Sequence, residues 1–211
     1  MKRTIVFVAL VCLAVAGVAS VGSAQGKTQK ISKDLVKRAK DTLKEIEKVE
    51  KRLDETMKQQ QKLLSKKNAK DRAKEQKKLQ EALEKTQDAV GDLQKQSQDM
   101  EQQADKFFTE WGKGVAALKD EELKKLSQQN LDSKRSQYGQ IVGTSRLAAT
   151  QYGEFVQNME ASLEYLKLDL SDQAVAQLDP KMRETQSQAS ALKGSTRELT
   201  KKIEGYIAAL N

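Results

Sequence analysis

The chain has 211 residues, of which 32% are charged and 4% are aromatic, and its formal net charge is +8. It contains no histidine, which removes the usual general base at neutral pH and the commonest metal ligand. Its single cysteine, Cys12, lies in the N-terminal leader, so the rest of the chain offers no disulfide and no thiol nucleophile. These absences predict a non-enzymatic protein with no catalytic residues, no metal site and no cofactor.

The first 24 residues have the layout of a secretory signal peptide. Lys2 and Arg3 precede an apolar stretch from Ile5 to about Val21, and Gly22-Ser23-Ala24 offers a small-residue cleavage site. We therefore expect cleavage after Ala24 and a mature periplasmic or secreted protein of residues 25–211. The alternative is an inner-membrane anchor, because the apolar stretch just reaches the length of a transmembrane helix.

Apolar residues recur three and four positions apart in the mature chain, which predicts long helices. The first stripe consists of Leu35, Ala39, Ile46, Val49, Leu53 and Leu63. The second stripe consists of Leu79, Leu83, Val90, Leu93, Met100, Ala104, Phe107 and Trp111. The two stripes are out of phase, since extending the first by heptads beyond Leu63 meets only lysines. This shift predicts a turn at Ser65–Asn68, with Asn68 as the N-cap of the following helix.

Two further helices follow. Asp120 precedes the third stripe and Ser171 precedes the fourth, which keeps its phase across Pro180 and so predicts a kink there. Glycines at 139, 143 and 153 interrupt the third helix, which suggests a close approach of another backbone.

The predicted fold class is all-α, with four long antiparallel helices that form an elongated, coiled-coil-like up-down bundle. We expect the helices over about 30–65, 68–116, 120–170 and 172–210, in a single domain. Helices joined by short turns must alternate in direction. Aligning the turns leaves residues 105–131 projecting as a two-helix tip.

Positive charge is concentrated in the first half of the chain. Residues 30–78 carry 18 basic and 9 acidic side chains, whereas residues 79–106 carry 3 and 7. Opposite charge predicts that these two neighbouring helices pair with each other. Nucleic-acid binding is not expected, because no aromatic residue is interleaved with the basic ones.

The second half of the chain resembles an exported bacterial family, domain of unknown function 2959. The resemblance rests on Phe108-Thr109-Glu110-Trp111, Glu122–Ser127, Arg135-Ser136-Gln137-Tyr138, Leu163–Lys167 and Gln173–Leu178. It covers residues 107–211, and the chain departs from the family pattern at Leu168-Asp169-Leu170-Ser171. The resemblance implies a periplasmic helical protein and supplies no activity.

Two groups of residues are candidate contact sites. The turn after the first helix carries Lys66, Lys67, Lys70, Arg72 and Lys74, which could contact anionic lipid or an acidic client, or could simply keep the turn soluble. Phe108 lies about 100° off the second stripe, so we expect it to be exposed while Trp111 belongs to the core.

Other constellations have simpler interpretations. Glu160 and Glu164 share a helix face and are expected to be solvated, since a di-metal bundle needs histidine as well. Met57, Met100, Met159 and Met182 lie in the stripes and are expected to pack in the core.

Three functional hypotheses remain open. The first is a non-enzymatic periplasmic protein that binds or scaffolds in the cell envelope, with an envelope protein or a second copy of itself as partner. The second is a periplasmic holdase chaperone with basic helical arms, and the third is a coiled-coil protein anchored in the membrane by its N-terminus. A weak contact with anionic lipid is compatible with each of them.

Overall fold

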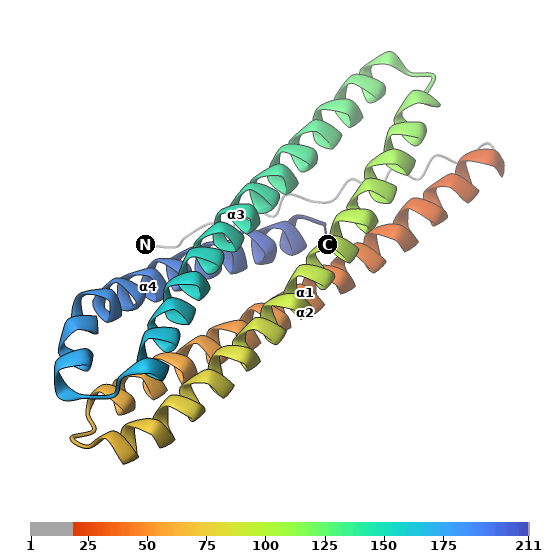
Figure 1. Cartoon of the computed structure of the whole chain (residues 1–211). Helices are drawn as coiled ribbons and strands as arrows, with labels where there is room; N and C mark the ends of the chain where they lie inside the picture. Colours follow the sequence, from red (N-terminus) through yellow and green to blue (C-terminus); the bar gives the residue numbers. More distant parts are fainter. Residues whose placement is uncertain (1–18, 211) are drawn as a thin grey trace, which may run out of the picture.

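The computed structural model describes residues 19–210, with side chains from Gly26 onward, and consists of four helices (Figure 1). They are α1 (Ala19–Leu64), α2 (Ala69–Ala116), α3 (Glu121–Leu168) and α4 (Asp172–Leu210). No strand occurs within residues 19–210, which confirms the all-α bundle. The expected signal peptide lies mostly outside the described residues, and α1 begins at Ala19 rather than near residue 30.

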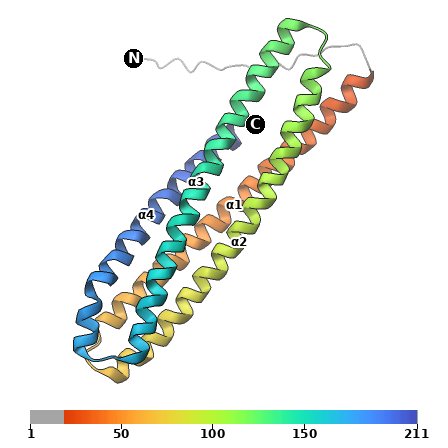
Figure 2. The ribbon, with the colours of Figure 1, turned by 45° about the horizontal axis from the view of Figure 1, so that its top comes forward.

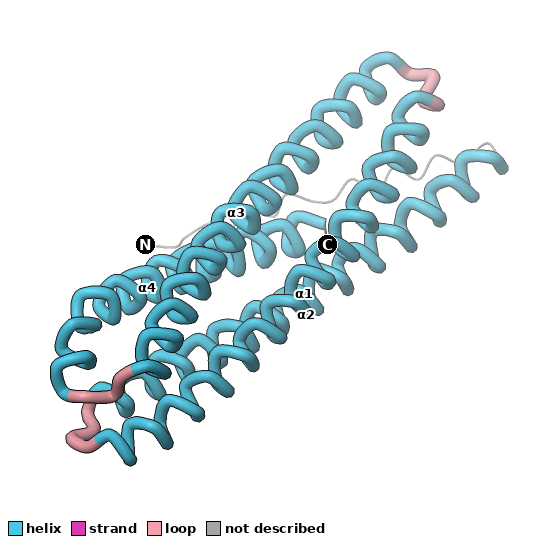
Figure 3. Tube along the Cα trace, viewed as in Figure 1, coloured by secondary structure: helices cyan, strands magenta, loops and turns pink. Residues whose placement is uncertain are grey.

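The helices form two antiparallel hairpins that pack side by side. α1 packs mainly against α2 and α3 mainly against α4, while α1 adjoins α4 and α2 adjoins α3 more sparsely. The turns α1–α2 and α3–α4 lie at one end of the bundle, and the α2–α3 turn lies at the other (Figure 3). That turn extends beyond the end of α4 (Figure 2). The expected two-helix tip is wrong in one respect, because α1 also runs beside α2 there, with Lys27 paired to Glu110 at 2.9 Å.

Side chains cap the helices where the sequence predicts. The Asn68 side chain accepts a hydrogen bond from the Asp71 backbone N–H at 2.9 Å. The carboxylate of Asp120 accepts from two backbone N–H groups, those of Glu122 and Leu123, at 2.9 Å each. These caps satisfy N–H groups that have no partner inside the helix, so they fix where α2 and α3 begin.

The predicted stripes form the core. Leu35, Ala39, Ile46, Val49, Leu53 and Leu63 are all at most 2% exposed, and most of the second stripe is buried as well. Polar side chains are buried among them: the hydroxyls of Thr56 and Thr86 lie 2.9 Å apart between α1 and α2. Gln60 donates to Thr185 on α4 at 2.7 Å. Because a buried polar group without a partner is costly, these pairs fix the register of α1 against both neighbours.

The region around Pro180 in α4 and the glycines of α3 test two expectations from the sequence. α4 continues through Pro180, and its first turns run at an angle to the rest of the helix (Figure 1), in agreement with the expected kink. The expected close backbone approach at the glycines of α3 is wrong. A Cβ placed at Gly139, Gly143 or Gly153 would meet no atom within 4 Å, because these glycines face away from the other helices.

Arg72 joins the two hairpins at the end where their turns meet. Its Nε donates to the carbonyl oxygen of Lys66 at 2.9 Å, and one Nη donates to that of Leu170 at 2.8 Å. The other Nη pairs with the carboxylate of Asp172, at the start of α4. The Arg72 side chain is only 7% exposed. Its planar guanidinium thus links the α1–α2 turn to the α3–α4 turn.

Replacing Arg72 by alanine should lower the free energy of unfolding by about 2–3 kcal/mol, because two carbonyl oxygens and Asp172 lose a charged donor. Denaturation in urea, followed by circular dichroism, measures the change. Lys74→Ala is the matched control, since Lys74 is exposed and has no ion pair with any described residue, and it should change stability by less than about 0.5 kcal/mol. Equal stability of the two variants would contradict the role of Arg72.

Candidate functional site

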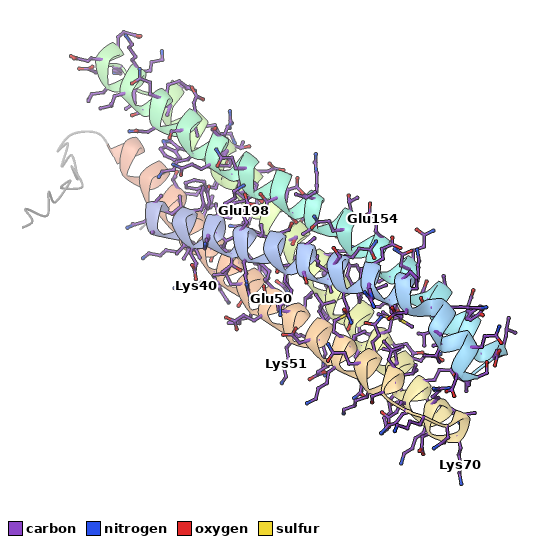
Figure 4. The ribbon with its side chains drawn as sticks, turned by 90° about the vertical axis from the view of Figure 1, so that its left-hand side faces the viewer. Lys40, Glu50, Lys51, Lys70, Glu154 and Glu198 are labelled. Carbon is purple, nitrogen blue, oxygen red and sulfur yellow. The ribbon has the colours of Figure 1, made fainter. Side chains whose placement is uncertain are left out.

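The basic turn divides into exposed and buried residues. Lys67, Lys70 and Lys74 are exposed and Lys66 is half-exposed, and none of the four has an ion pair among the described residues. Figure 4 shows Lys70 at the end of the bundle. Arg72 differs, because it is buried and all its side-chain nitrogens hydrogen-bond within the protein. The prediction of Arg72 as a contact residue is therefore wrong; it holds the fold.

The outer face of α1 carries a row of lysines that the charge count alone did not locate. At 100° per residue, nine exposed lysines fall within a sector about 80° wide, opposite the buried stripe. One of them, Lys48 at the edge of the sector, pairs with Asp92 of α2, and the other eight make no ion pair with α2. We call these residues the lysine stripe: Lys30, Lys33, Lys37, Lys40, Lys44, Lys51, Lys58 and Lys62. The stripe is about 48 Å long at 1.5 Å per residue. Lys40 and Lys51 point away from the bundle in Figure 4.

The lysine stripe takes no part in the pairing of α1 with α2. That pairing, which the sequence predicts, uses Arg38 on the flank of α1, which lies 3.4 Å from Asp99, and Lys48 at the edge of the stripe's sector, which contacts Asp92. Within the stripe only Lys44 has an ion pair, with Asp41 on the same helix at 2.9 Å. The remaining seven ammonium groups are left for solvent or for an anionic partner.

The aromatic residues near the tip form one cluster. The ring centroid of Phe108 lies 5.5 Å from that of Phe107 and 6.0 Å from that of Tyr138 on α3. The guanidinium carbon of Arg135 lies 5.6 Å from the centroid of the Phe108 ring. Phe108 is only 6% exposed, whereas Trp111 is partly buried at the edge of the cluster. The expected exposure of Phe108 is wrong because α3 covers that flank of α2.

A slot opens between α2 and α3 in the middle of the bundle. It has two adjoining lobes of about 210 Å³ and 100 Å³, which share Ser97, Ser145 and Leu199. Its rim includes the exposed side chains Gln94 and Gln98 of α2. The floor consists of buried residues of α1 and α4, namely Val49, Leu192, Thr196 and Leu199.

Tyr152 gives the slot a polar group without a partner. Its hydroxyl is buried and makes no hydrogen bond with any of the described residues. Burial, with Glu160 and Asp88 nearby, raises the pKa of Tyr152 well above its usual value, so the hydroxyl stays protonated. A buried hydroxyl of this kind is a donor for which the fold supplies no acceptor.

The remaining candidates lie apart from one another. The Glu160 carboxylate accepts from Gln87 at 2.9 Å, and no group of three or more acidic, histidine or cysteine side chains in the described residues could hold a metal. Met100, Met159 and Met182 are buried, as expected for packing. A Ser-x-x-Lys spacing occurs at Ser190 and Lys193, but Ser190 bonds a backbone oxygen and Lys193 pairs with Asp54 on α1.

Phe108→Ala should lower the free energy of unfolding by about 3–4 kcal/mol, the usual loss for a buried phenylalanine. Trp111→Ala should cost less, because the indole is partly exposed. Urea denaturation of both variants measures the order. A larger loss at Trp111 than at Phe108 would show that α3 does not cover the flank of α2.

Comparison with known proteins identifies the family of the chain but no individual relative. No curated protein and no solved structure matches the chain. None of the described helices is long and apolar enough to cross a bilayer. The family model described as "Protein of unknown function (DUF2959)" matches residues 23–210, so the match extends over the first hairpin, which the sequence resemblance did not include. The chain therefore belongs to the family of domain of unknown function 2959.

Proposed function

We propose that this protein is a non-enzymatic scaffold of the bacterial cell envelope that lies along an anionic lipid surface through the lysine stripe of α1. The observation that carries the proposal is the row of eight exposed lysines on one face of a long helix. Each lysine held near an anionic membrane contributes about 1 kcal/mol of attraction, so a row of them binds although each contact is weak.

The composition of the stripe favours a lipid surface over a specific protein partner. Protein interfaces are depleted in lysine and enriched in aromatic residues and arginine. The basic residues of the stripe are all lysine, although the half-exposed Glu55 lies in the same sector, and no aromatic side chain of the described residues is more than partly exposed. A lysine ammonium is a hydrated point charge on a flexible stem, which suits a diffuse anionic surface.

The holdase alternative receives less support. A chaperone for unfolded clients needs contiguous apolar surface that unfolded segments can cover. The exposed large apolar side chains among the described residues are Leu126, Leu147 and Leu168. They lie about 20 residues apart along α3, which spaces them by roughly 30 Å and leaves no continuous patch.

Reversing four charges of the stripe tests the proposal. The variant Lys33→Glu, Lys37→Glu, Lys40→Glu, Lys51→Glu should bind vesicles of phosphatidylglycerol and phosphatidylcholine at least tenfold more weakly than the unmodified protein in a sedimentation assay. Binding of the unmodified protein should fall as salt increases, because the Debye length shortens from about 10 Å at 0.1 M to about 3 Å at 1 M.

The matched control reverses four exposed cations of α3 and α4 that have no ion pair in the described structure: Lys125, Lys167, Arg197 and Lys201. It changes the net charge equally and should retain most of the binding. Equal losses of vesicle binding in both variants would show that binding depends on the net charge of the protein and not on the lysine stripe. Equal binding to vesicles of phosphatidylcholine alone would refute the electrostatic contact.

Export to the periplasm predicts a processed chain. Mass spectrometry of protein from the periplasmic fraction should give an N-terminus at Gln25, because the small residues before it suit signal peptidase. Intact Met1 in a membrane fraction that resists a salt wash would instead indicate the N-terminal anchor.

A further inference from the structure

The slot between α2 and α3 is closed at both ends by contacts between these helices. Gln87 of α2 donates to Glu160 of α3 at 2.9 Å on one side, and Phe108 meets Tyr138 on the other. Between these contacts the slot follows α2 from Val90 to Glu101. That is about 16 Å of helix at 1.5 Å per residue.

The dimensions of the slot select a thin and flexible ligand. A helix of a partner protein is about 10 Å across and does not fit lobes of 210 Å³ and 100 Å³. Together the lobes reach only the lower limit of the volumes usual for small-molecule sites. A single alkyl chain, laid along the slot, has the matching narrow and elongated shape.

The lining has the polarity of an amphiphile. Val49, Leu192 and Leu199 form an apolar floor, where each methylene of a ligand would leave water. The polar groups of the lining differ in depth: the unpartnered hydroxyl of Tyr152, a residue that lines one lobe, is buried, whereas Arg146 at the other lobe is exposed. Glu101 also lines the second lobe, and neither charge has an ion pair in the described structure, so the mouth has no net charge.

We propose that the slot binds one alkyl chain of an amphiphile, with the chain on the apolar floor and the head group at the mouth. This site is separate from the lysine stripe and goes beyond the scaffold role. α1 contributes only buried residues to it, Thr42 and Val49, on the side of α1 that faces away from the stripe. A fatty acid and a lysophospholipid share the chain that the slot selects, and they differ in the head group.

Titration with dodecanoyl-lysophosphatidylcholine, below its critical micelle concentration, tests the site by calorimetry. The probe has no net charge, so the lysine stripe does not attract it. We expect saturable binding of one molecule per chain that persists at 1 M NaCl and in the charge-reversed stripe variant. Dodecanoate is the second probe, titrated into the charge-reversed stripe variant because it is an anion: tighter binding than the lysophospholipid assigns Arg146 to the head group, and equal binding assigns recognition to the chain alone.

Filling the slot supplies the matched variants. Ser97→Leu and Ser145→Leu place a larger side chain where both lobes meet, and each should weaken binding at least tenfold. Ser136→Leu adds the same side chain to an exposed position of α3 outside the slot and should leave binding unchanged. Circular dichroism melts establish that each variant is folded.

A photoreactive dodecanoate gives a readout that does not depend on variants. Crosslinks should map to peptides that contain residues 90–101 of α2 and 138–152 of α3. Absence of saturable binding, unchanged binding in both slot variants, or crosslinks confined to other residues would each overturn the proposal. None of these outcomes bears on vesicle binding by the stripe, so the two proposals fail separately.

Discussion

The guanidinium of Arg72 reaches from the first hairpin into the turn of the second and satisfies two carbonyl oxygens that no helix can satisfy. Because it also pairs with Asp172 at the start of α4, it holds both turns at one end of the bundle. The bond between Gln60 and Thr185 fixes the level of α1 against α4 near the same end. Farther along, the small side chains of Ser97, Ser145 and Ala148 line the space between the hairpins without filling it, and the slot lies there.

The first hairpin can carry many charged residues because the buried stripe of α1 is narrow. α1 buries one row of residues against α2 and α4, so the opposite face is open to any hydrophilic residue. A structural requirement for solubility would be met by mixed charges, as on α4, where Glu198 and Arg197 are neighbours. Eight lysines in one row repel one another at a cost that pairing with α2 does not offset. Such a row therefore favours a function in binding anions.

The predictable parts of the structure are those that local chemistry decides. The phase shift after Leu63 and the side chain of Asn68 locate the first turn without any knowledge of the partner helices. Phe108 and Arg72 were misassigned because their surroundings come from distant helices: Tyr138 covers one, and Leu170 accepts from the other. The lysine stripe was within reach of the sequence, since plotting the basic residues at 100° per residue reveals it. The slot was not, because it depends on the spacing between hairpins.

The positions of the lysine stripe and of the slot determine how the protein could occupy both at once. α1 contributes its outer face to the stripe and only its buried side to the slot, whereas α2 and α3 form the rim. A molecule that lies on a bilayer through α1 therefore holds the mouth of the slot away from the bilayer beneath α1. An alkyl chain in the slot would come from the aqueous side or from a second membrane. A scaffold that contacts a lipid surface through one face and an amphiphile through another joins the two, and neither contact requires a catalytic group.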